Sequence, residues 1–272
     1  MNEPGFTEMP FPANREMIVD VMELSRRKHH VSGFVEIDVT LARTYIQRYR
    51  SMTGNRISFT GWVVKCLGQA VHEYPQIHAM RKGKRKLIIF DDVDILVTIE
   101  KQLKEEIIPL PYVVRKANEK SLLQVSDEIR AGQAADQIGK GMMIGQESLF
   151  LKLYQHSPGF IRRIIGRKLA KDPMYVKQSV GTVGVSSIGM MGKYNGWITP
   201  ASPQPLYFAL GSINRKPGVV QDEIKICEKL SVSFLFDHDV IDGAPVARFI
   251  DRLTSLMESA YGLDHLIPTN EV

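Results

Sequence analysis

Apolar residues recur at helical spacing in four parts of the chain, near residues 15–30, 59–73, 121–139 and 243–261. The second part begins at Ser58 or Thr60, continues through a long apolar body and stops at a proline, which predicts a buried helix. In the last part, Val246, Phe249 and Leu253 fall on one face, as in a helix that covers a core. The pattern alone therefore predicts four helices.

Strand-like runs, alternating or continuously apolar, fill much of the chain between these helices. They are GFVEIDVT, KLIIFDDVDILVTIE, GTVGVSSIGMMG, PLYFALGSI and KICEKLSVSFLFDH, of which the second predicts two strands broken at its aspartates. The helical and strand patterns are mixed in order, without a repeat or a linker. The simplest interpretation is a single α/β domain over residues 1–272.

Composition places the chain among soluble globular proteins, since 44% of its 272 residues are apolar and 24% are charged. No apolar run approaches the roughly 18 residues of a membrane span, so we expect no transmembrane segment. The N-terminus lacks the basic start and apolar run of a secretory signal, which predicts a cytoplasmic protein. The net charge of +5 comes from Lys and Arg interleaved with acids, a pattern that does not favour nucleic acid as a partner.

One segment, at about 146–178, departs from this even mixture. It has a clear excess of Lys and Arg, with Phe160, Ile161 and Ile164 at helix-like spacing. We expect an amphipathic helical insertion that covers its own patch of the surface. A lid over a channel, a docking face for a partner and a membrane-surface contact remain open as alternatives.

Candidate chemistry concentrates in DHDVIDG, residues 237–243. His238 ends an apolar strand-like run and precedes the Asp-Gly turn of Asp242 and Gly243, which predicts an imidazole on a rigid strand tip. The other histidines have no such context and are interpreted as surface or packing residues. Cys66 and Cys227 are too few and too far apart for a zinc site or a disulfide framework, so we expect buried free thiols and no metal.

DHDVIDG resembles the HxxxDG signature of the CoA-dependent acyltransferase superfamily. That superfamily includes the acyltransferase catalytic domains of 2-oxoacid dehydrogenase complexes, the chloramphenicol acetyltransferases and the condensation domains of peptide synthetases. Four further segments resemble the dehydrogenase-complex members in the same order: REMIVDVMELSRRKHHVSGFVEIDVT, ISFTGWVVKCLGQAVHEYPQIHA, GTVGVSSIGMMG and PLYFALGSI. The resemblance covers about residues 13–258, with a break near 133–180, and implies a chloramphenicol acetyltransferase-like two-layer sandwich with a mixed β-sheet and flanking helices.

The resemblance also implies an enzyme, an acyltransferase in which His238 is the general base that takes the proton from an attacking thiol. Ser186, with Ser187 as the fallback, would donate to the oxyanion of the tetrahedral intermediate. The aspartate that matches Asp242 is mainly structural in the family, paired with an arginine near the N-terminus, for which Arg15 is the candidate. Gly243 would serve the backbone geometry of the turn.

Coenzyme A, as acyl-CoA, is the substrate that the resemblance implies, and a homotrimer is the expected assembly, with each histidine reaching into a neighbour's pocket. The chain resembles the catalytic domain alone, so we expect no covalently attached lipoyl group on it. The favoured acceptor is a lipoyl domain supplied in trans. A chloramphenicol-type small-molecule O-acetyltransferase and a non-catalytic trimeric scaffold remain as alternatives.

Two departures from the family pattern bear on the acceptor. The family's channel segment appears here as EKQLKEEIIPLPYVVRKAN, in which charged residues replace small ones at Lys101, Lys104, Glu105 and Glu106. Asp239 follows His238 where the dehydrogenase complexes usually have arginine. The acceptor is therefore not fixed by the resemblance.

Overall fold

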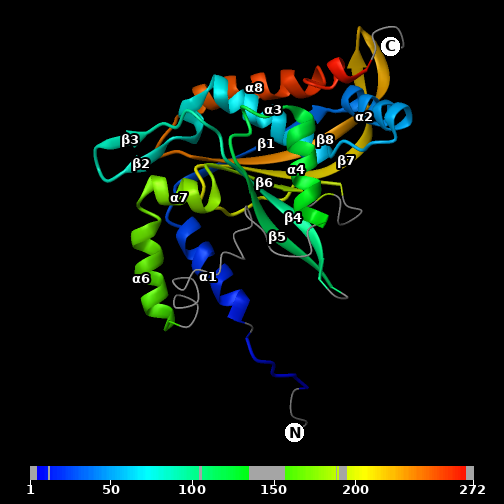
Figure 1. The fold of residues 1–272 in the computed structure, drawn as a ribbon. Coiled ribbons are helices and arrows are strands. Elements are labelled where there is room, and N and C mark those ends of the chain that lie inside the picture. The colour runs from blue at the N-terminus through cyan, green and yellow to red at the C-terminus, as the bar shows by residue number, and fades with distance from the viewer. Residues whose placement is uncertain are drawn as a thin grey trace.

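The computed structural model describes residues 5–11, 13–103, 106–134, 157–187, 189 and 195–267. A six-stranded mixed sheet runs through it in the order β1-β8-β7-β6-β4-β5 (Figure 1). Its strands are β1 (His30–Asp38), β4 (Ile95–Leu103), β5 (Glu106–Val114), β6 (Val183–Ser187), β7 (Leu206–Val220) and β8 (Glu223–Asp237). The β6 strand is parallel to both of its neighbours, and the other pairings are antiparallel. A small separate sheet pairs β2 (Met80–Lys82) with β3 (Lys86–Ile88).

One face of the large sheet is covered by a layer of helices (Figure 1). The helices are α2 (Thr40–Thr53), α3 (Phe59–Glu73), α4 (Leu122–Ala134) and α8 (Gly243–Glu258), and two single 3-10 turns lie at Pro75–His78 and Asp264–Leu266. Trp62, Phe208 and Phe249 are the largest fully buried side chains of the shared core. The predicted two-layer arrangement of a mixed sheet and flanking helices is therefore confirmed.

The α3 helix shows why the sequence pattern was informative here. Ser58 caps it, since its hydroxyl accepts a hydrogen bond from the Gly61 amide at 3.1 Å. Trp62 is buried without leaving its polar atom unpaired, because Nε1 donates to the Tyr261 carbonyl at 3.1 Å. Helix boundaries set by a cap and a proline are those that the sequence predicted.

The α2 helix and the β5 strand are among the elements that the sequence did not predict. The α2 helix follows Asp38, whose carboxylate accepts from the Thr40 amide at 3.0 Å, and ends at Gly54 with φ 73°. The β5 strand contains Pro109 and Pro111, which argue against a central strand. The two prolines are tolerated because β5 lies at the edge of the sheet, where one row of amides has no strand to pair with.

The remaining helices lie apart from the sandwich layers. They are α1 (Ala13–Ser25), α6 (Gly159–Leu169) and α7 (Pro173–Val180), and α1 lies beside α6 (Figure 1). Arg162 of α6 joins them by ion pairs with Glu16 and with Asp20, the latter at 3.0 Å. The helix expected over 15–30 ends at Ser25, because the chain from His30 pairs with β8. In the described part of the chain, no helix is both long and apolar enough to cross a bilayer.

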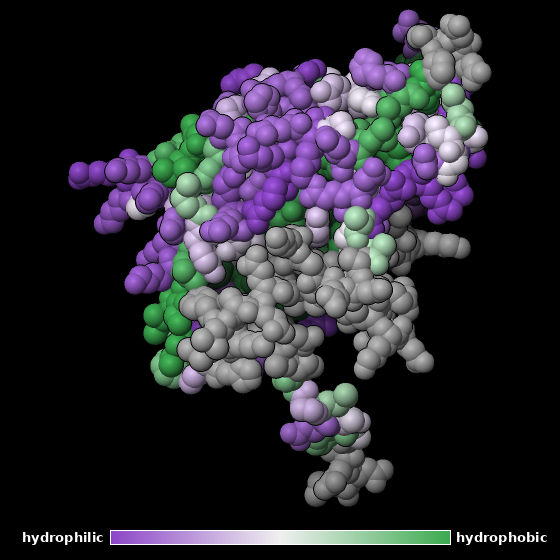
Figure 2. Space-filling view, viewed as in Figure 1, coloured by the Kyte–Doolittle hydropathy of each residue, from purple (hydrophilic) through white to green (hydrophobic). Residues whose placement is uncertain are grey.

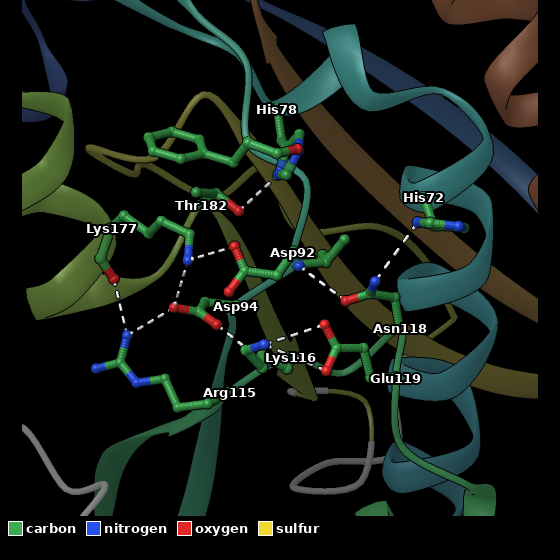
Figure 3. A network of polar contacts seen from close by, with 12 residues as sticks. His72, His78, Asp92, Asp94, Arg115, Lys116, Asn118, Glu119, Lys177 and Thr182 are labelled. Atoms are coloured by element: carbon green, nitrogen blue, oxygen red, sulfur yellow. Dashed lines mark hydrogen bonds and ion pairs between the residues drawn. The ribbon is translucent and has the colours of Figure 1, made fainter.

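A polar network fixes α7 against the start of β4 (Figure 3). The Lys177 ammonium lies 2.8 Å from the Asp92 carboxylate and 3.2 Å from that of Asp94. Arg115 donates to Asp94 and to the Lys177 carbonyl, both at 2.9 Å. Since Asp94 is buried, both cations compensate its charge, and the insertion is held to the sheet by this network.

Buried His78 lies next to this network and is held neutral (Figure 3). Its Nδ1 is 2.7 Å from the Thr182 hydroxyl, and its Nε2 is 3.2 Å from the Phe90 carbonyl. A carbonyl can only accept, so Nε2 carries the proton and Nδ1 accepts from Thr182. Burial, the largest cause, lowers the pKa of His78 to about 4.

The lowered pKa predicts acid sensitivity. Above about pH 6.5, where the unfolded imidazole is also neutral, the full stability is present, and it is lost as the pH falls from 6.5 toward 4. We expect His78 alone to lower the free energy of unfolding by about 3 kcal/mol over this interval. Urea denaturation at a series of pH values measures the slope of the free energy of unfolding against pH.

The matched variants are His78→Gln and His30→Gln. Burial also lowers the pKa of His30, so each substitution should remove only its own share of the slope. A pH slope that is unchanged in a folded His78→Gln protein would contradict the prediction.

Candidate active site

His238 lies immediately after β8 and just before α8, at the end of the sheet. Its side chain is 44% exposed. Its backbone amide donates to the His29 carbonyl at 3.0 Å, which ties the tip of β8 to the residue before β1. The strand-tip position predicted from the sequence is therefore present.

The residues on either side of His238 are clamped by the segment that leads into β1. Lys28 donates to the buried Asp237 carboxylate at 2.5 Å. The Asp239 carboxylate lies 2.9 Å from Nδ1 of His29, and this contact is the main cause that lowers the pKa of Asp239. Two ion-pair contacts thus hold the backbone around His238 while its ring remains accessible.

The His238 ring packs on Phe236, with 5.6 Å between ring centroids. Its Nδ1 lies 3.9 Å from the Asp242 carboxylate, too far for a hydrogen bond. Among the described residues, no hydrogen bond fixes the ring. Nδ1 faces Asp242, which leaves Nε2 as the nitrogen available to a reacting group.

The supporting residues occupy different positions from those expected. Asp242 is the N-cap residue of α8, its side chain is 88% exposed, and it makes no capping hydrogen bond. Arg15 is exposed on α1, and within the described residues no ion pair joins it to Asp242. A Cβ at Gly243 would meet nothing within 4 Å, so crowding does not demand glycine there. Asp242 is better described as a charge near the imidazole than as half of a buried ion pair.

Ser186 is buried on β6, on the face of the sheet opposite the helix layer. Successive side chains of a strand point to opposite faces, and the neighbouring Val185 belongs to the core on the helix side. Ser186 therefore points away from the helices. On the Ser186 face, burial raises the pKa of Tyr207, and hydrogen bonds with the Ser186 and Thr98 side chains oppose that shift. The Ser186 hydroxyl therefore lies buried on β6, beside the Tyr207 side chain.

His238 and Ser186 of one chain are far apart. Ser186 pairs with Ala209, and Ala209 pairs with Ser233, so Ser186 and Ser233 are level with each other across the sheet. From Ser233 to His238 the chain advances about 17 Å along β8, and the two strand spacings add about 10 Å sideways. A single subunit does not bring the two groups onto one reacting atom.

Two cavities lie near these segments, one next to His238 and one beside Ser187 on the helix-side face, opposite to the face of Ser186. An apolar groove of about 520 Å³ between β1 and α8 is lined by Phe34, Phe236, Val246 and Ile250, next to His238. A cavity of about 580 Å³ lies beside Ser187 and Gly189, where Arg43 and Arg50 of α2 form part of its wall. Arg43 is paired with Glu228 at 2.8 Å, whereas Arg50 is exposed.

Several expectations fall outside what the structure describes. Residues 146–156 of the insertion, Lys104 and Glu105 lie outside the described residues, as do the side chains of Lys101 and Glu106. No three His, Cys, Asp or Glu side chains of the described ranges gather as a metal site. Cys66 and Cys227 are buried free thiols, and burial raises the pKa of Cys66.

Sequence reasoning missed two parts of the site. Lys28 was not predicted as part of the site, because its partner Asp237 is remote in sequence. Arg50 lies on α2, a helix that was not predicted, although Leu41, Tyr45 and Tyr49 have helical spacing. The arrangement as described offers an accessible imidazole, a buried hydroxyl donor and a guanidinium at a cavity.

Comparison with known proteins gives a consistent picture. The family described as 2-oxoacid dehydrogenases acyltransferase (catalytic domain) matches residues 3–141 and 161–263. The lipoamide acyltransferase component of the branched-chain alpha-keto acid dehydrogenase complex of Bacillus subtilis (strain 168) is 24% identical over 261 residues. That match covers 94% of this chain and 53% of the relative, so the chain spans about half the length of that protein.

Solved structures support the fold. The dihydrolipoamide acetyltransferase of Azotobacter vinelandii, investigated for the role of a serine, a histidine and an asparagine in its catalytic mechanism, has a TM-score of 0.67 at 19% identity. The match covers 95% of this chain and 94% of that chain. A chloramphenicol acetyltransferase has a TM-score of 0.52 at 13% identity, over 91% and 96% of the two chains. The expected chloramphenicol acetyltransferase-like fold is confirmed.

Proposed function

This chain belongs to the family of 2-oxoacid dehydrogenase acyltransferase catalytic domains, and on that premise we propose that it transfers an acyl group between CoA and a thiol acceptor. The favoured acceptor is a lipoyl group supplied in trans. The observation that carries the proposal is the accessible imidazole of His238 on a clamped strand tip. The same spacing that separates Ser186, His238 and Asp242 separates the serine, histidine and asparagine of the Azotobacter enzyme.

The chemistry requires a base for a thiol. A thiol with a pKa of about 8.5 is mostly protonated at neutral pH, and an imidazole is a matched acceptor for its proton. As the proton moves to Nε2 of His238, the sulfur forms a bond to the thioester carbonyl carbon. The tetrahedral intermediate then breaks its bond to the departing sulfur, which takes the proton back from the imidazolium. No covalent bond to the protein is formed.

The negative oxygen of that intermediate needs a donor, and Ser186 has the properties for this role. Its hydroxyl is buried on the central strand β6, and a donor of this kind is typically worth about 3 kcal/mol in the transition state. Because Ser186 and His238 of one chain lie far apart, we infer that each site joins His238 of one subunit to Ser186 of a neighbour. In a closed ring of subunits, every boundary joins a His238 to a neighbouring Ser186, and the trimer is the proposed ring.

Phosphates of CoA require cations, and Arg50 is the best placed of those described. It lies at the cavity beside Ser187, is exposed, and carries a planar guanidinium suited to phosphate oxygens. Arg43 contributes less, since it is paired with Glu228. We propose that this cavity receives the phosphate-bearing part of acyl-CoA.

Replacing Arg50 with alanine is expected to raise the KM for acetyl-CoA by about three- to tenfold, as loss of an exposed charge-assisted contact predicts. The value of kcat and the thermal midpoint should change little. Initial rates over a range of acetyl-CoA concentrations measure the effect, with Arg56→Ala, another exposed arginine, as the control. Equal KM values for wild type and Arg50→Ala would remove Arg50 from the CoA site.

The proposed function is tested by thioester exchange from acetyl-CoA to dihydrolipoamide, followed as free thiol, alongside the same assay with chloramphenicol. Transfer to dihydrolipoamide supports the proposal, and transfer only to chloramphenicol supports the O-acetyltransferase alternative. Normal CoA binding without turnover on either acceptor would favour a non-catalytic scaffold.

A further inference from the structure

Three neighbouring elements on one side of the molecule expose cations beside large apolar side chains. They are α6, α7 and the hairpin of β2 and β3, in which α7 packs between the other two (Figure 1). Figure 2 shows hydrophilic side chains at the tip of the hairpin and hydrophobic side chains over α6. We call this combination the basic face, and neither the proposed reaction nor the core accounts for it.

On α6 the inner and outer sides differ sharply. The inner side carries Arg162, which forms ion pairs with Glu16 and Asp20 of α1. The outer side exposes Phe160 and Ile164, one turn apart and 63% and 61% exposed. Around them lie the exposed cations Arg163, Arg167, Lys168 and Lys171.

The hairpin repeats this composition. It exposes the cations Lys82, Lys84, Arg85 and Lys86, and the apolar side chains Leu87 and Ile89 follow them at the surface. On α7, Met174 is also exposed. Across residues 80–89 and 159–175 the sequence contains a single acid, Asp172. Among the described residues, none of the hairpin or outer α6 cations named above forms an ion pair.

The charge and apolar exposure of the basic face indicate which kind of partner it binds. A second copy placed face to face would bring like charges together, which disfavours a symmetric contact. A nucleic acid would use the cations but leave Phe160 and Ile164 in water. An anionic bilayer surface satisfies both components, because its headgroups pair with the cations while the apolar side chains enter the headgroup boundary. Membrane association generally needs two signals, and the basic face has both a cluster of cations and exposed apolar side chains.

We propose that the basic face docks this protein on anionic phospholipid membranes. The contact is peripheral, with α6 and the β2–β3 hairpin lying against the headgroups. The basic-face side chains named above include none of the proposed reaction residues, although Arg81 of the same hairpin lies 4.0 Å from the Asp239 carboxylate, next to His238. The docking would occur whether or not the chain transfers acyl groups.

Co-sedimentation of the full chain with vesicles tests the proposal. Vesicles of phosphatidylcholine mixed with phosphatidylglycerol should bind the protein, and vesicles of phosphatidylcholine alone should bind it much more weakly. The pair Phe160→Ser and Ile164→Ser, and separately the pair Arg167→Glu and Lys168→Glu, should each weaken binding by at least about tenfold. Added salt should weaken binding further.

Matched controls remove the trivial explanations. Ile224→Ser with Ile226→Ser changes two exposed isoleucines on β8, away from the basic face, and should bind as the wild type does. Lys225→Glu with Arg248→Glu serves the same purpose for charge. Circular dichroism confirms that each variant is folded.

Two results would overturn the proposal. One is wild-type binding to mixed vesicles that none of the basic-face substitutions weakens. The other is absence of binding to the mixed vesicles. Binding to DNA or to an acidic polypeptide that the α6 substitutions weaken would then assign the face to a polyanion instead.

Discussion

Replacing His238 with alanine is expected to lower kcat for acyl transfer by about a hundredfold to ten-thousandfold, as loss of a general base predicts. The side chain is 44% exposed, and among the described residues no hydrogen bond holds its ring, so the substitution removes chemistry without opening the core. The thermal midpoint should therefore stay close to that of the wild type. Free thiol release from acetyl-CoA with dihydrolipoamide measures the rate.

The control is His29→Ala. His29 is also exposed and also lies beside an acid, Asp239, but its ring belongs to the clamp and not to the proposed reaction. Its removal should change kcat by less than about fivefold, since an exposed ion pair contributes little. If both variants lost activity equally, or if His238→Ala remained active, the imidazole of His238 would not be the base.

The environment of Asp242 differs from the one that the family resemblance implied. A buried ion pair with Arg15 would have made Asp242→Ala destabilising by several kcal/mol. The observed carboxylate is exposed instead, with the imidazole at 3.9 Å. Within one subunit, Asp242 therefore lies near the His238 ring without forming a hydrogen bond to it or a buried ion pair.

The sequence was most informative where local signals decide the structure. The helix over 59–73 was predicted at its observed bounds, because a serine cap and a proline stop mark its ends. The helix from Gly243 was predicted for a similar reason, since its apolar stripe faces the core. The β5 strand was missed because its prolines oppose a strand, and only its place at the sheet edge makes it possible.

The site was predictable only in part. His238 and Ser186 were found through motifs, but motifs carry no information on which face of the sheet each side chain occupies. That depends on strand order and register, which place Ser186 level with Ser233 and leave His238 further along β8. The Lys28–Asp237 and Arg162–Asp20 ion pairs were also beyond sequence reasoning, because both join segments that only the fold brings together.

Replacing Ser186 with alanine is expected to lower kcat by about a hundredfold to a thousandfold, as for other single oxyanion donors, with little change in the KM for acetyl-CoA. The hydroxyl is buried, so the measurement needs a stability control, and Ser233→Ala on the same face of the sheet provides one. Since Ser233 has no hydrogen-bond partner for its hydroxyl among the described residues, its removal should cost neither rate nor stability.

The two inactive variants together test the shared site. If His238 and Ser186 act across a subunit boundary, co-assembly of His238→Ala and Ser186→Ala chains in equal amounts creates some boundaries where both groups are intact. In a ring with random assembly, about a quarter of the sites recover both groups, and activity should return to about a quarter of the wild-type value. A site built within one chain gives no recovery, because every chain then lacks one group. Co-expression, with each variant alone as the baseline, therefore distinguishes the two arrangements by presence or absence of activity.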